Sequence, residues 1–251
     1  MPQFLVAPTD IHGERFILRG PEAFHVSRVM RCREGQTIEI FDGKGGRYSG
    51  LIERIQQDGT VEGRVVEVLH SPERLAKVTL NLYLGLLKAS RWDWAIEKAT
   101  EVGVSMIVPV LTPRTVVQLR DEATPKKLER WKRILVSAAK QCGRPDVPEL
   151  QEPRHFRDVV LEAARGGLTL VGWAKPGASV SLHEILTKAR QHKSSTTVNL
   201  FIGPEGGFSE DEAELAEMEG AHLFHLGCDT LRSETAALVA SALVLHDMGR
   251  L

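Results

Sequence analysis

The stretch FIGPEGGFSEDE, residues 201–212, passes from an apolar strand-like run into a glycine-rich turn and then into a cluster of acidic residues. A second stretch, HLGCDTLRSETAALVA at 225–240, repeats this order with an apolar run, a glycine and a helix-forming sequence. In an open sheet of parallel strands, ligands bind outside the carboxyl ends of the strands. Two glycine-containing strand ends this close in sequence therefore predict one binding site built from both loops.

The sequence around these two stretches alternates between apolar runs and amphipathic helical patterns. Strands are expected at 78–87, 104–111, 168–174, 197–203 and 221–227, and helices at 91–103, 125–141, from Ser181, from Ser209 and at 233–248. Ser209 and Glu212 have the spacing of a capping box, and Gly103 is placed to end its helix. Because parallel strands need crossovers of helix length, this alternation predicts an α/β fold with a mostly parallel sheet.

The first 70 residues follow a different pattern, with short strand-like runs separated by turns such as DGKGG and QDG. Several short strands with tight turns predict a small β-barrel. One short helical piece, residues 21–31, would place His25, Arg28 and Arg31 on one face. The segment 70–77 is the expected boundary, which gives a β-barrel domain at 1–72 and an α/β domain at 73–251.

Composition excludes several classes of protein. The net charge is −1, and the three cysteines, Cys32, Cys142 and Cys228, have no CxxC spacing, so we expect reduced thiols and no zinc or other metal site. The N-terminal residues lack the features of a signal peptide, and the longest apolar run, ten residues, is too short to span a bilayer. These features predict a soluble, cytoplasmic protein with no membrane partner.

Basic residues gather in one part of the sequence. From Arg114 to Arg144 there are nine Lys or Arg against three acidic residues, a local charge of +6. Such a stretch is either a solvated helix face or a surface that binds an anionic polymer, and the sequence leaves both open.

The glycine turn at 203–207 does not match the common nucleotide-binding motifs. A P-loop requires a lysine after its last glycine, whereas Phe208 stands there, and a dinucleotide fingerprint belongs in the first strand–helix turn of its domain. The carboxylate of Glu205 would repel a polyphosphate. The turn therefore favours a neutral or cationic ligand in close contact with the backbone, and adenosine attached to a sulfonium group has these properties.

These two stretches resemble the two signature stretches of the RsmE family of SPOUT-superfamily methyltransferases. Members of this family methylate N3 of a single uridine in 16S rRNA, with S-adenosylmethionine as the methyl donor. The similarity also covers 25–52, which resembles the PUA-like N-terminal barrel of the family, and the middle stretches 86–115 and 138–150. It extends over nearly the whole chain.

The resemblance implies a SPOUT-type parallel-sheet domain with a deep trefoil knot, preceded by a small PUA-like β-barrel that binds RNA. It also implies a homodimer that acts on 16S rRNA within the 30S subunit. Knotted chains are rare, and the periodicity of the sequence does not predict one.

The resemblance further implies roles for individual residues. Arg232 would stabilise the uracil anion, and Glu205 or Glu234 would accept the N3 proton. The cofactor would contact Gly172, Trp173, Ile202, Gly203, Glu205, Gly206, Gly207, Leu226, Gly227, Leu231, Thr235 and Ala236. RNA phosphates would contact Arg19, Arg28, Arg31, Arg114 and Arg144.

Three other functions remain compatible with the sequence. The chain could be a SPOUT-type methyltransferase with a different RNA target, another nucleotide-using enzyme such as an oxidoreductase, or a non-catalytic RNA-binding protein that has kept the fold. Binding of S-adenosylmethionine rather than NAD, and transfer of its methyl group to RNA, would distinguish these possibilities.

Overall fold

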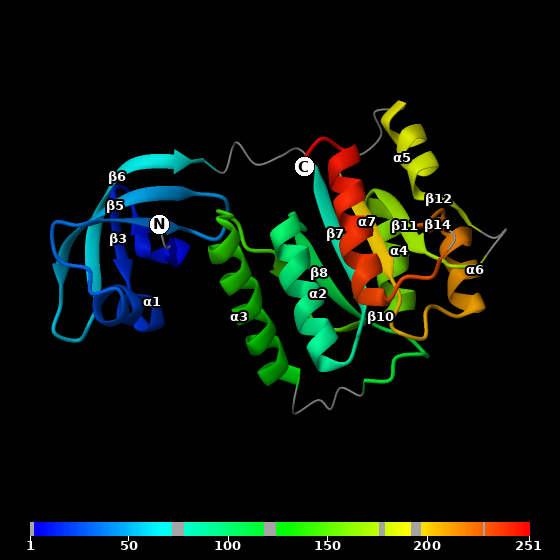
Figure 1. Cartoon of the computed structure of the whole chain (residues 1–251), viewed down its shortest axis with the longest axis horizontal. Coiled ribbons are helices and arrows are strands. Elements are labelled where there is room, and N and C mark those ends of the chain that lie inside the picture. The colour runs from blue at the N-terminus through cyan, green and yellow to red at the C-terminus, as the bar shows by residue number, and fades with distance from the viewer. Residues whose placement is uncertain (1–2, 72–77, 118–123, 176–178, 192–196, 228) are drawn as a thin grey trace. The chain divides into compact units, whose positions relative to one another are not determined.

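The computed structural model describes residues 3–71, 78–117, 124–175, 179–191, 197–227 and 229–251 (Figure 1). The chain forms two compact units. The first consists of residues 1–75 together with 135–147, and the second consists of residues 76–134 and 148–251. The sequence-based boundary between residues 72 and 73 falls outside the described residues and stays a prediction.

Among the described residues, the first unit is built on a six-stranded sheet. In spatial order its strands are β1 (Gln3–Leu5), β4 (Thr37–Phe41), β5 (Arg47–Ile55), β6 (Val61–His70), β3 (Arg15–Leu18) and β2 (Ile11–His12). β1 and β4 are parallel, and the other neighbours are antiparallel. A short 3-10 helix, η1 (Pro8–Asp10), joins β1 to β2. The sheet buries a core that includes Phe4, Phe16 and Ile52.

The helical piece expected at 21–31 is shorter than predicted. It consists of α1 (Gly20–Phe24) followed by one turn of π-helix, η2 (His25–Val29). The backbone N–H of Met30 donates to the carbonyl of His25 at 2.8 Å, which is the i→i+5 bond of a π turn. Arg31 lies beyond the end of the helix with a left-handed φ of 54°. The prediction that Arg31 shares a helical face with His25 and Arg28 is therefore wrong.

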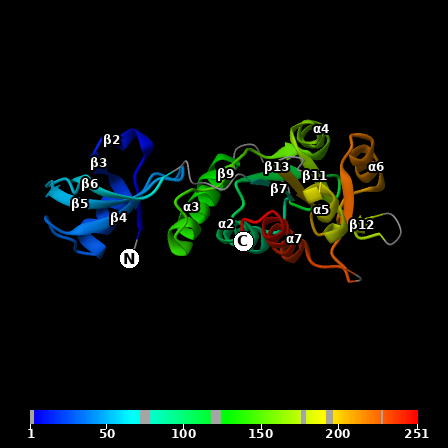
Figure 2. The ribbon, with the colours of Figure 1, turned by 90° about the horizontal axis from the view of Figure 1, so that it is seen from above.

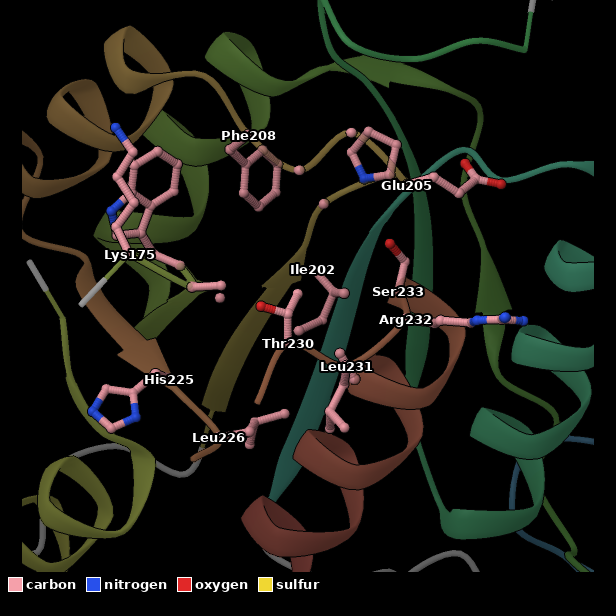
Figure 3. Close-up of a pocket in the computed structure, with 18 of the residues that line it drawn as sticks. Lys175, Ile202, Glu205, Phe208, His225, Leu226, Thr230, Leu231, Arg232 and Ser233 are labelled. Carbon is pink, nitrogen blue, oxygen red and sulfur yellow. The ribbon is translucent and has the colours of Figure 1, made fainter. Parts of the chain in front are cut away.

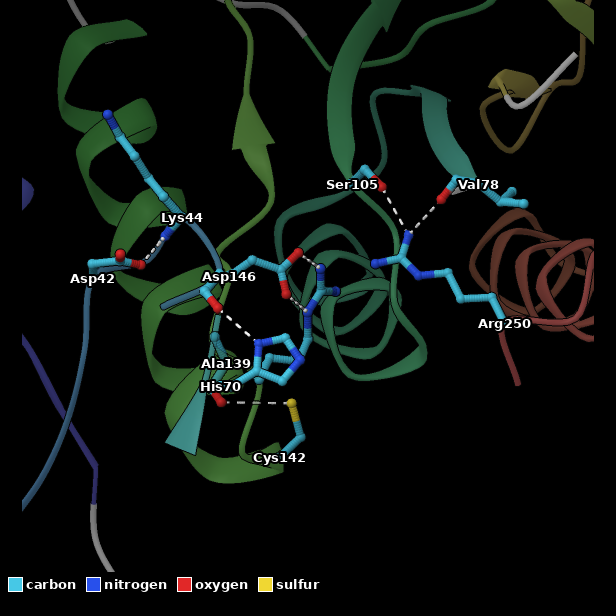
Figure 4. A network of polar contacts seen from close by, with 11 residues as sticks. Asp42, Lys44, His70, Val78, Ser105, Ala139, Cys142, Asp146 and Arg250 are labelled. Carbon is cyan, nitrogen blue, oxygen red and sulfur yellow. Dashed lines mark hydrogen bonds and ion pairs between the residues drawn. The ribbon is translucent and has the colours of Figure 1, made fainter. Parts of the chain in front are cut away.

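Residues 135–147 complete the first unit although they lie far along the chain. The backbone N–H of Gly45 donates to the carbonyl of Pro145 at 3.0 Å, and that of Val147 donates to the carbonyl of Gly43 at 3.0 Å. His70 Nδ1 lies 2.8 Å from the carbonyl oxygen of Gly45, so the same turn also contacts the end of β6. Figure 4 shows Asp42, Lys44, His70 and Asp146 around this turn. The turn at 43–45 thus pairs with the loop after α3 (Thr124–Cys142).

The second unit contains the predicted parallel sheet. Its main path runs in the order β10 (Arg154–His155), β8 (Met106–Leu111), β7 (Thr79–Gly85), β13 (Thr197–Ile202), β11 (Leu168–Gly172), β14 (His222–His225) and β12 (Val180–Ser181), and β9 (Glu149–Leu150) pairs with β8. Every pairing among these strands is parallel. The α/β class predicted from the alternation of strands and helices is confirmed.

Cross-strand contacts hold the centre of this sheet together. On adjacent strands β7 and β13, the rings of Tyr83 and Phe201 stack with centroids 4.2 Å apart and an interplanar angle of 7°. Asn81 Nδ2 donates to Asn199 Oδ1 at 2.9 Å, and Asn199 Nδ2 donates to the carbonyl of Ala163 at 2.9 Å. The buried amide of Asn199 is therefore hydrogen-bonded, as a polar group in a dry core requires.

Helices cover both faces of the sheet (Figures 1 and 2). α4 (Phe156–Gly166) and α6 (Glu210–Met218) pack on one face, where Phe156, Phe201 and Phe208 share a core. α2 (Ala89–Val102) and α7 (Ser233–Asp247) pack against each other on the other face, while α5 (Leu182–Gln191) follows β12. The sequence analysis did not identify α4.

Two helix ends have the geometry that the sequence predicts. Gly103 ends α2 in the left-handed region with φ 118°. At the start of α6, the hydroxyl of Ser209 accepts from the N–H of Glu212, and the carboxylate of Glu212 accepts from the N–H of Ser209 at 2.8 Å. This capping box is confirmed. Glu212 is only 8% exposed, and burial raises the pKa of its carboxyl group above the usual value.

The raised pKa of Glu212 predicts how stability changes with pH. Because the folded protein binds this proton more tightly than the unfolded chain, the contribution of Glu212 is greatest below the usual glutamate pKa and is lost as pH rises through the raised pKa. Glu212→Gln keeps an oxygen that can accept the hydrogen bond from the N–H of Ser209, but its side chain cannot ionise. In urea titrations across the acidic range, wild type should therefore lose stability relative to Glu212→Gln as pH rises.

Glu210→Gln is the matched control for this experiment. The ion pair with Lys175 lowers the pKa of the exposed carboxyl of Glu210, so its contribution is lost as pH falls rather than as it rises. If the stability difference from wild type changes with pH in the same direction for both variants, burial does not determine the effect at Glu212.

Candidate functional site

The two glycine loops identified in the sequence meet at the carboxyl edge of the sheet in the second unit. β13 leads into residues 203–208, and β14, which is separated from β13 by β11, leads into residues 226–232. Together with the end of β11 they enclose a cavity of about 480 Å³ (Figure 3). This volume lies within the range of small-molecule sites. The predicted meeting of the two loops is therefore observed.

The first loop is positioned by close backbone contact with the end of β7. A Cβ atom on Gly85 would lie 2.3 Å from the backbone nitrogen of Pro204, so only glycine fits there. Within the loop, a Cβ atom on Gly203 would lie 3.0 Å from the Cα of Gly207, which itself has a left-handed φ of 67°. The sequence analysis missed Gly85, although a glycine that ends an apolar strand is a recognisable sign of close backbone approach.

Arg114 supports the same loop from the residues that follow β8. Its Nη1 donates to the carbonyl of Gly206 at 3.1 Å and to that of Phe208 at 2.9 Å. A Cβ atom on Gly206 would lie 3.1 Å from the Cβ of Arg114. The Arg114 side chain thus fixes the far side of the loop. The sequence analysis had instead expected Arg114 to contact an RNA phosphate.

The cavity wall combines apolar side chains with backbone. Ile202 and Phe208 are buried, and the Trp173 side chain, 8% exposed, lies beneath the ammonium group of Lys175, 5.5 Å from the ring centroid. Leu231 is partly exposed on the opposite side, at 37%. Figure 3 shows Ile202, Thr230 and Leu231 around the middle of the cavity.

Most of the residues expected to bind the cofactor line this one cavity. They are Gly172, Trp173, Ile202, Gly203, Glu205, Gly206, Gly207, Leu226, Gly227, Leu231 and Ala236. Thr235, the remaining one, is not part of the lining but lies in the first turn of α7 between the lining residues Ser233 and Ala236. Lining residues that the sequence analysis did not single out include Arg91, Lys175, Phe208, His225 and Thr230.

The two carboxylates expected to accept a proton are linked by one guanidinium group. Arg91, at the start of α2, places Nη1 3.5 Å from Glu205 Oε1 and Nε 3.7 Å from Glu234 Oε1. The backbone N–H of Lys88 also donates to Glu205 Oε1 at 3.3 Å. Glu234 Oε2 is buried and accepts no hydrogen bond from the described residues. Arg91 therefore fixes Glu205 of the first loop relative to Glu234 of α7.

Arg232 is the cation of the second loop. It occupies the N-cap position of α7, its side chain is exposed, and no hydrogen bond or ion pair joins its guanidinium group to the described residues. Figure 3 shows it extending toward α2, on the same side as Glu205. An arginine at this position has its donors available for an anion placed beside the cavity.

The remaining arginines of the RNA-binding prediction lie in the first unit and have different surroundings. Arg144 forms an ion pair with Asp146 at 2.6 Å and has a side chain only 10% exposed, and Arg19 lies 3.6 Å from Asp10. Arg28 and Arg31 are exposed. Contact of these residues with RNA stays a prediction.

The described part of the chain contains no group of three or more His, Cys, Asp or Glu side chains that could bind a metal ion. None of its helices is long and apolar enough to cross a membrane. Cys32 and Cys142 are free thiols, and Cys228 lies outside the described residues.

Comparison with known proteins gives consistent matches over most of the chain. Residues 74–245 match the family profile of an RNA methyltransferase domain, and residues 18–66 match that of an RNA methyltransferase PUA domain. The ribosomal RNA small subunit methyltransferase E of Mycobacterium tuberculosis is 31% identical over 235 residues, which are 91% of this chain and 85% of that protein. The corresponding Bacillus subtilis protein is 28% identical over 92% of this chain and 90% of its own length.

Solved structures give the same result. The methyltransferase E of Neisseria gonorrhoeae bound to S-adenosylmethionine has a TM-score of 0.81, with 26% identity over 98% of this chain and 97% of that chain. A putative methyltransferase from Legionella pneumophila, also with S-adenosylmethionine, has a TM-score of 0.82 and 29% identity over 97% and 96% of the two chains. The predicted class, a SPOUT-type knotted parallel-sheet domain preceded by a PUA-like barrel, is confirmed.

The contact between Gly85 and Pro204 generates a prediction about the first loop. Gly85→Ala places a methyl group against backbone that cannot rotate away, so the loop must shift, with a stability loss of about 1–3 kcal/mol. Calorimetry should show weakened binding of S-adenosylmethionine. Gly166→Ala, where a Cβ atom would meet nothing within 4 Å, should leave both stability and binding unchanged or slightly improved. Normal binding by Gly85→Ala would exclude the loop from the site.

Proposed function

The chain belongs to the ribosomal RNA small subunit methyltransferase E (RsmE) family of RNA methyltransferases, and from this we propose that it methylates N3 of one uridine in 16S rRNA. The methyl donor is S-adenosylmethionine. The observation that carries the proposal is the cavity between the two glycine loops. Residues of both stretches that resemble the family line this cavity.

The residues of the cavity fit this cofactor. The glycines at 203, 206 and 207 carry no side chains, which permits close contact between the loop backbone and a nucleoside. Ile202, Leu226 and Leu231 provide apolar contacts for a flat ring. Glu205 and Asp229 are the acidic residues of the lining. Because the Glu205 carboxylate is paired with Arg91, Asp229 is the acidic residue of the lining that would favour the positively charged sulfur of the cofactor.

When bound, S-adenosylmethionine supplies a methyl group on a positively charged sulfur. The protein must then make N3 of uridine nucleophilic by removing its proton and stabilising the negative charge that spreads to O2 and O4. We assign charge stabilisation to Arg232, whose guanidinium group is exposed beside the cavity. Glu205 or Glu234 accepts the proton, and Arg91 orients both carboxylates.

The substrate side of the proposal involves the first unit. We propose a PUA-like β-barrel domain at 1–72 that binds 16S rRNA within the 30S subunit, and a methyltransferase domain at 73–251. Arg28 and Arg31 are the best placed of the predicted phosphate contacts because both are exposed. Arg19 and Arg144 would first have to leave their ion pairs, and Arg114 would have to release the 203–208 loop. We also propose that the protein acts in the cytoplasm.

We further propose a homodimer whose interface includes α2 and α7. These helices pack together, and each has a large apolar side chain exposed, with Trp94 at 40% and Leu243 at 46%. α7 is apolar on its buried side as well, where Ala240, Val244 and Leu245 pack inward. A helix that is apolar on all sides is normally covered on all sides, and a second copy of the chain would cover the exposed side.

The dimer can be tested with a charge placed on α7. Light scattering at micromolar concentration should give twice the mass of one chain for wild type and the mass of one chain for Leu243→Arg. Met218→Arg, at an 83% exposed position on α6, is the control and should stay dimeric. A wild-type monomer, or a Leu243→Arg dimer, would contradict this interface.

Methyl transfer to isolated small subunits tests the function and the role of Arg232 together. Wild type should transfer labelled methyl from S-adenosylmethionine to N3 of a uridine, and Arg232→Ala should be slower by roughly 10²–10³-fold, the scale for loss of one oxyanion donor. Cofactor affinity should change little. Higher pH should partly restore turnover, since hydroxide then generates more of the uracil anion.

Arg157→Ala is the control, because Arg157 is an exposed arginine on α4 outside the cavity lining. It removes the same charge and should keep wild-type turnover. If the loss of activity in Arg232→Ala follows a loss of thermal stability, the residue is structural. If wild type binds S-adenosylmethionine but transfers no methyl to subunits, the protein acts on another RNA or is not an enzyme.

A further inference from the structure

In the described part of the first unit, three of the five exposed large apolar side chains lie in one short segment, residues 24–33. Phe24, Val29 and Met30 are 60%, 57% and 44% exposed, respectively. The segment is nevertheless anchored from below, because Ala23 and Val26 are buried in the core and the His25 ring contacts the Phe4 ring edge-on with centroids 5.5 Å apart. The exposed side chains therefore project from a fixed backbone.

The same segment carries positive charge and contains no acidic residue. Arg28, Arg31 and Arg33 are exposed, and no acidic residue occurs between Glu22 and Glu34. None of the three guanidinium groups forms an ion pair or hydrogen bond with the described residues. Elsewhere in this unit the pairs Arg19–Asp10, Arg64–Glu53, Lys140–Glu22 and Arg144–Asp146 are formed.

The backbone of the segment is also irregular at two successive points. Its helix ends in the single π turn η2, a feature that is frequent at functional sites. Arg31 then adopts φ 54°, the one left-handed residue other than glycine in the described chain. This conformation is unfavourable for a residue with a side chain, and such strain often accompanies function.

We propose that residues 24–33 bind unpaired nucleotides of the RNA substrate, with a base stacked on Phe24 and phosphates held by Arg28, Arg31 and Arg33. This inference rests on the proposed function and specifies which form of RNA the first unit recognises. Phe24 and Arg28 are four residues apart on a helical stretch and so share a face. An aromatic ring beside cations is the arrangement that binds single-stranded nucleic acid.

The chemistry of the segment favours unpaired RNA over a duplex. The bases of a duplex are stacked on each other and unavailable to Phe24, so a duplex could use only the arginines. An unpaired strand can use both the ring and the arginines. Val29 and Met30 add apolar surface that could contact sugar or base edges.

The experiment uses the full chain and a short unstructured RNA oligonucleotide, free or annealed to its complement, with binding followed by fluorescence anisotropy. Wild type should prefer the free strand. Phe24→Leu, which keeps apolar bulk but removes the ring, should weaken binding of the free strand by about 10-fold. Phe24→Trp, which keeps a stacking surface, should retain affinity, whereas Val68→Ala, at another 60% exposed position in this unit, should have no effect.

Arg31→Gly separates RNA binding from folding. Glycine adopts the left-handed region without penalty, so this variant should melt at the same temperature as wild type or higher. It should nevertheless bind the free strand more weakly and reduce the slope of log affinity against log salt by about 0.7, the value for one lost phosphate contact on a single strand. Unchanged affinity and slope would overturn the proposal.

Two further outcomes would also overturn it. One is equal affinity of Phe24→Leu and wild type for the free strand. The other is that wild type binds anionic vesicles, and that the Phe24 and Arg31 variants lose this binding while they bind RNA as wild type does. The segment would then be a membrane contact. Each outcome leaves the proposed function intact if wild type still methylates small subunits. If wild type transfers no methyl and binds no S-adenosylmethionine, the proposed function fails whatever residues 24–33 bind.

Discussion

The close approach of Pro204 to Gly85 is the constraint on which the candidate site depends. β7 and β13 lie side by side in the centre of the sheet, joined by the Tyr83–Phe201 stack and the Asn81–Asn199 hydrogen bond. Since β7 ends in glycine, the chain leaving β13 can turn directly across it. Arg114 and Arg91 then reach the turned loop from the residues after β8 and from α2. A side chain at position 85 would lift the loop from all of these partners.

Much of the second unit could be read from the sequence because its signals are local. The strands at 197–202 and 222–225, the capping box at Ser209 and the end of α2 at Gly103 each follow from short patterns. The meeting of the two glycine loops follows from one rule about parallel sheets. The knot, the homodimer and the individual roles came only from the resemblance to a family, since no local pattern encodes threading or assembly.

What the sequence did not reveal depends on contacts between distant residues. Arg91 pairs with Glu205 and Glu234, which are more than a hundred positions away, and nothing near Arg91 in the sequence marks it. Arg31 was assigned to a helical face because the spacing of three looked regular, but the π turn ends the helix first. α4 was missed although its buried side chains Phe156, Val159, Val160 and Ala163 have helical spacing.

The pairing of residues 43–45 with 145–147 has a consequence for synthesis of the chain. A ribosome releases the strands of the first unit early, yet the loop that pairs with the turn at 43–45 emerges only after β7, α2 and β8 have been made. The turn at 43–45 therefore lacks this partner while the second unit begins to form. Completion of the first unit is tied to the folding of α3, so the two units are coupled in time even though each has its own core.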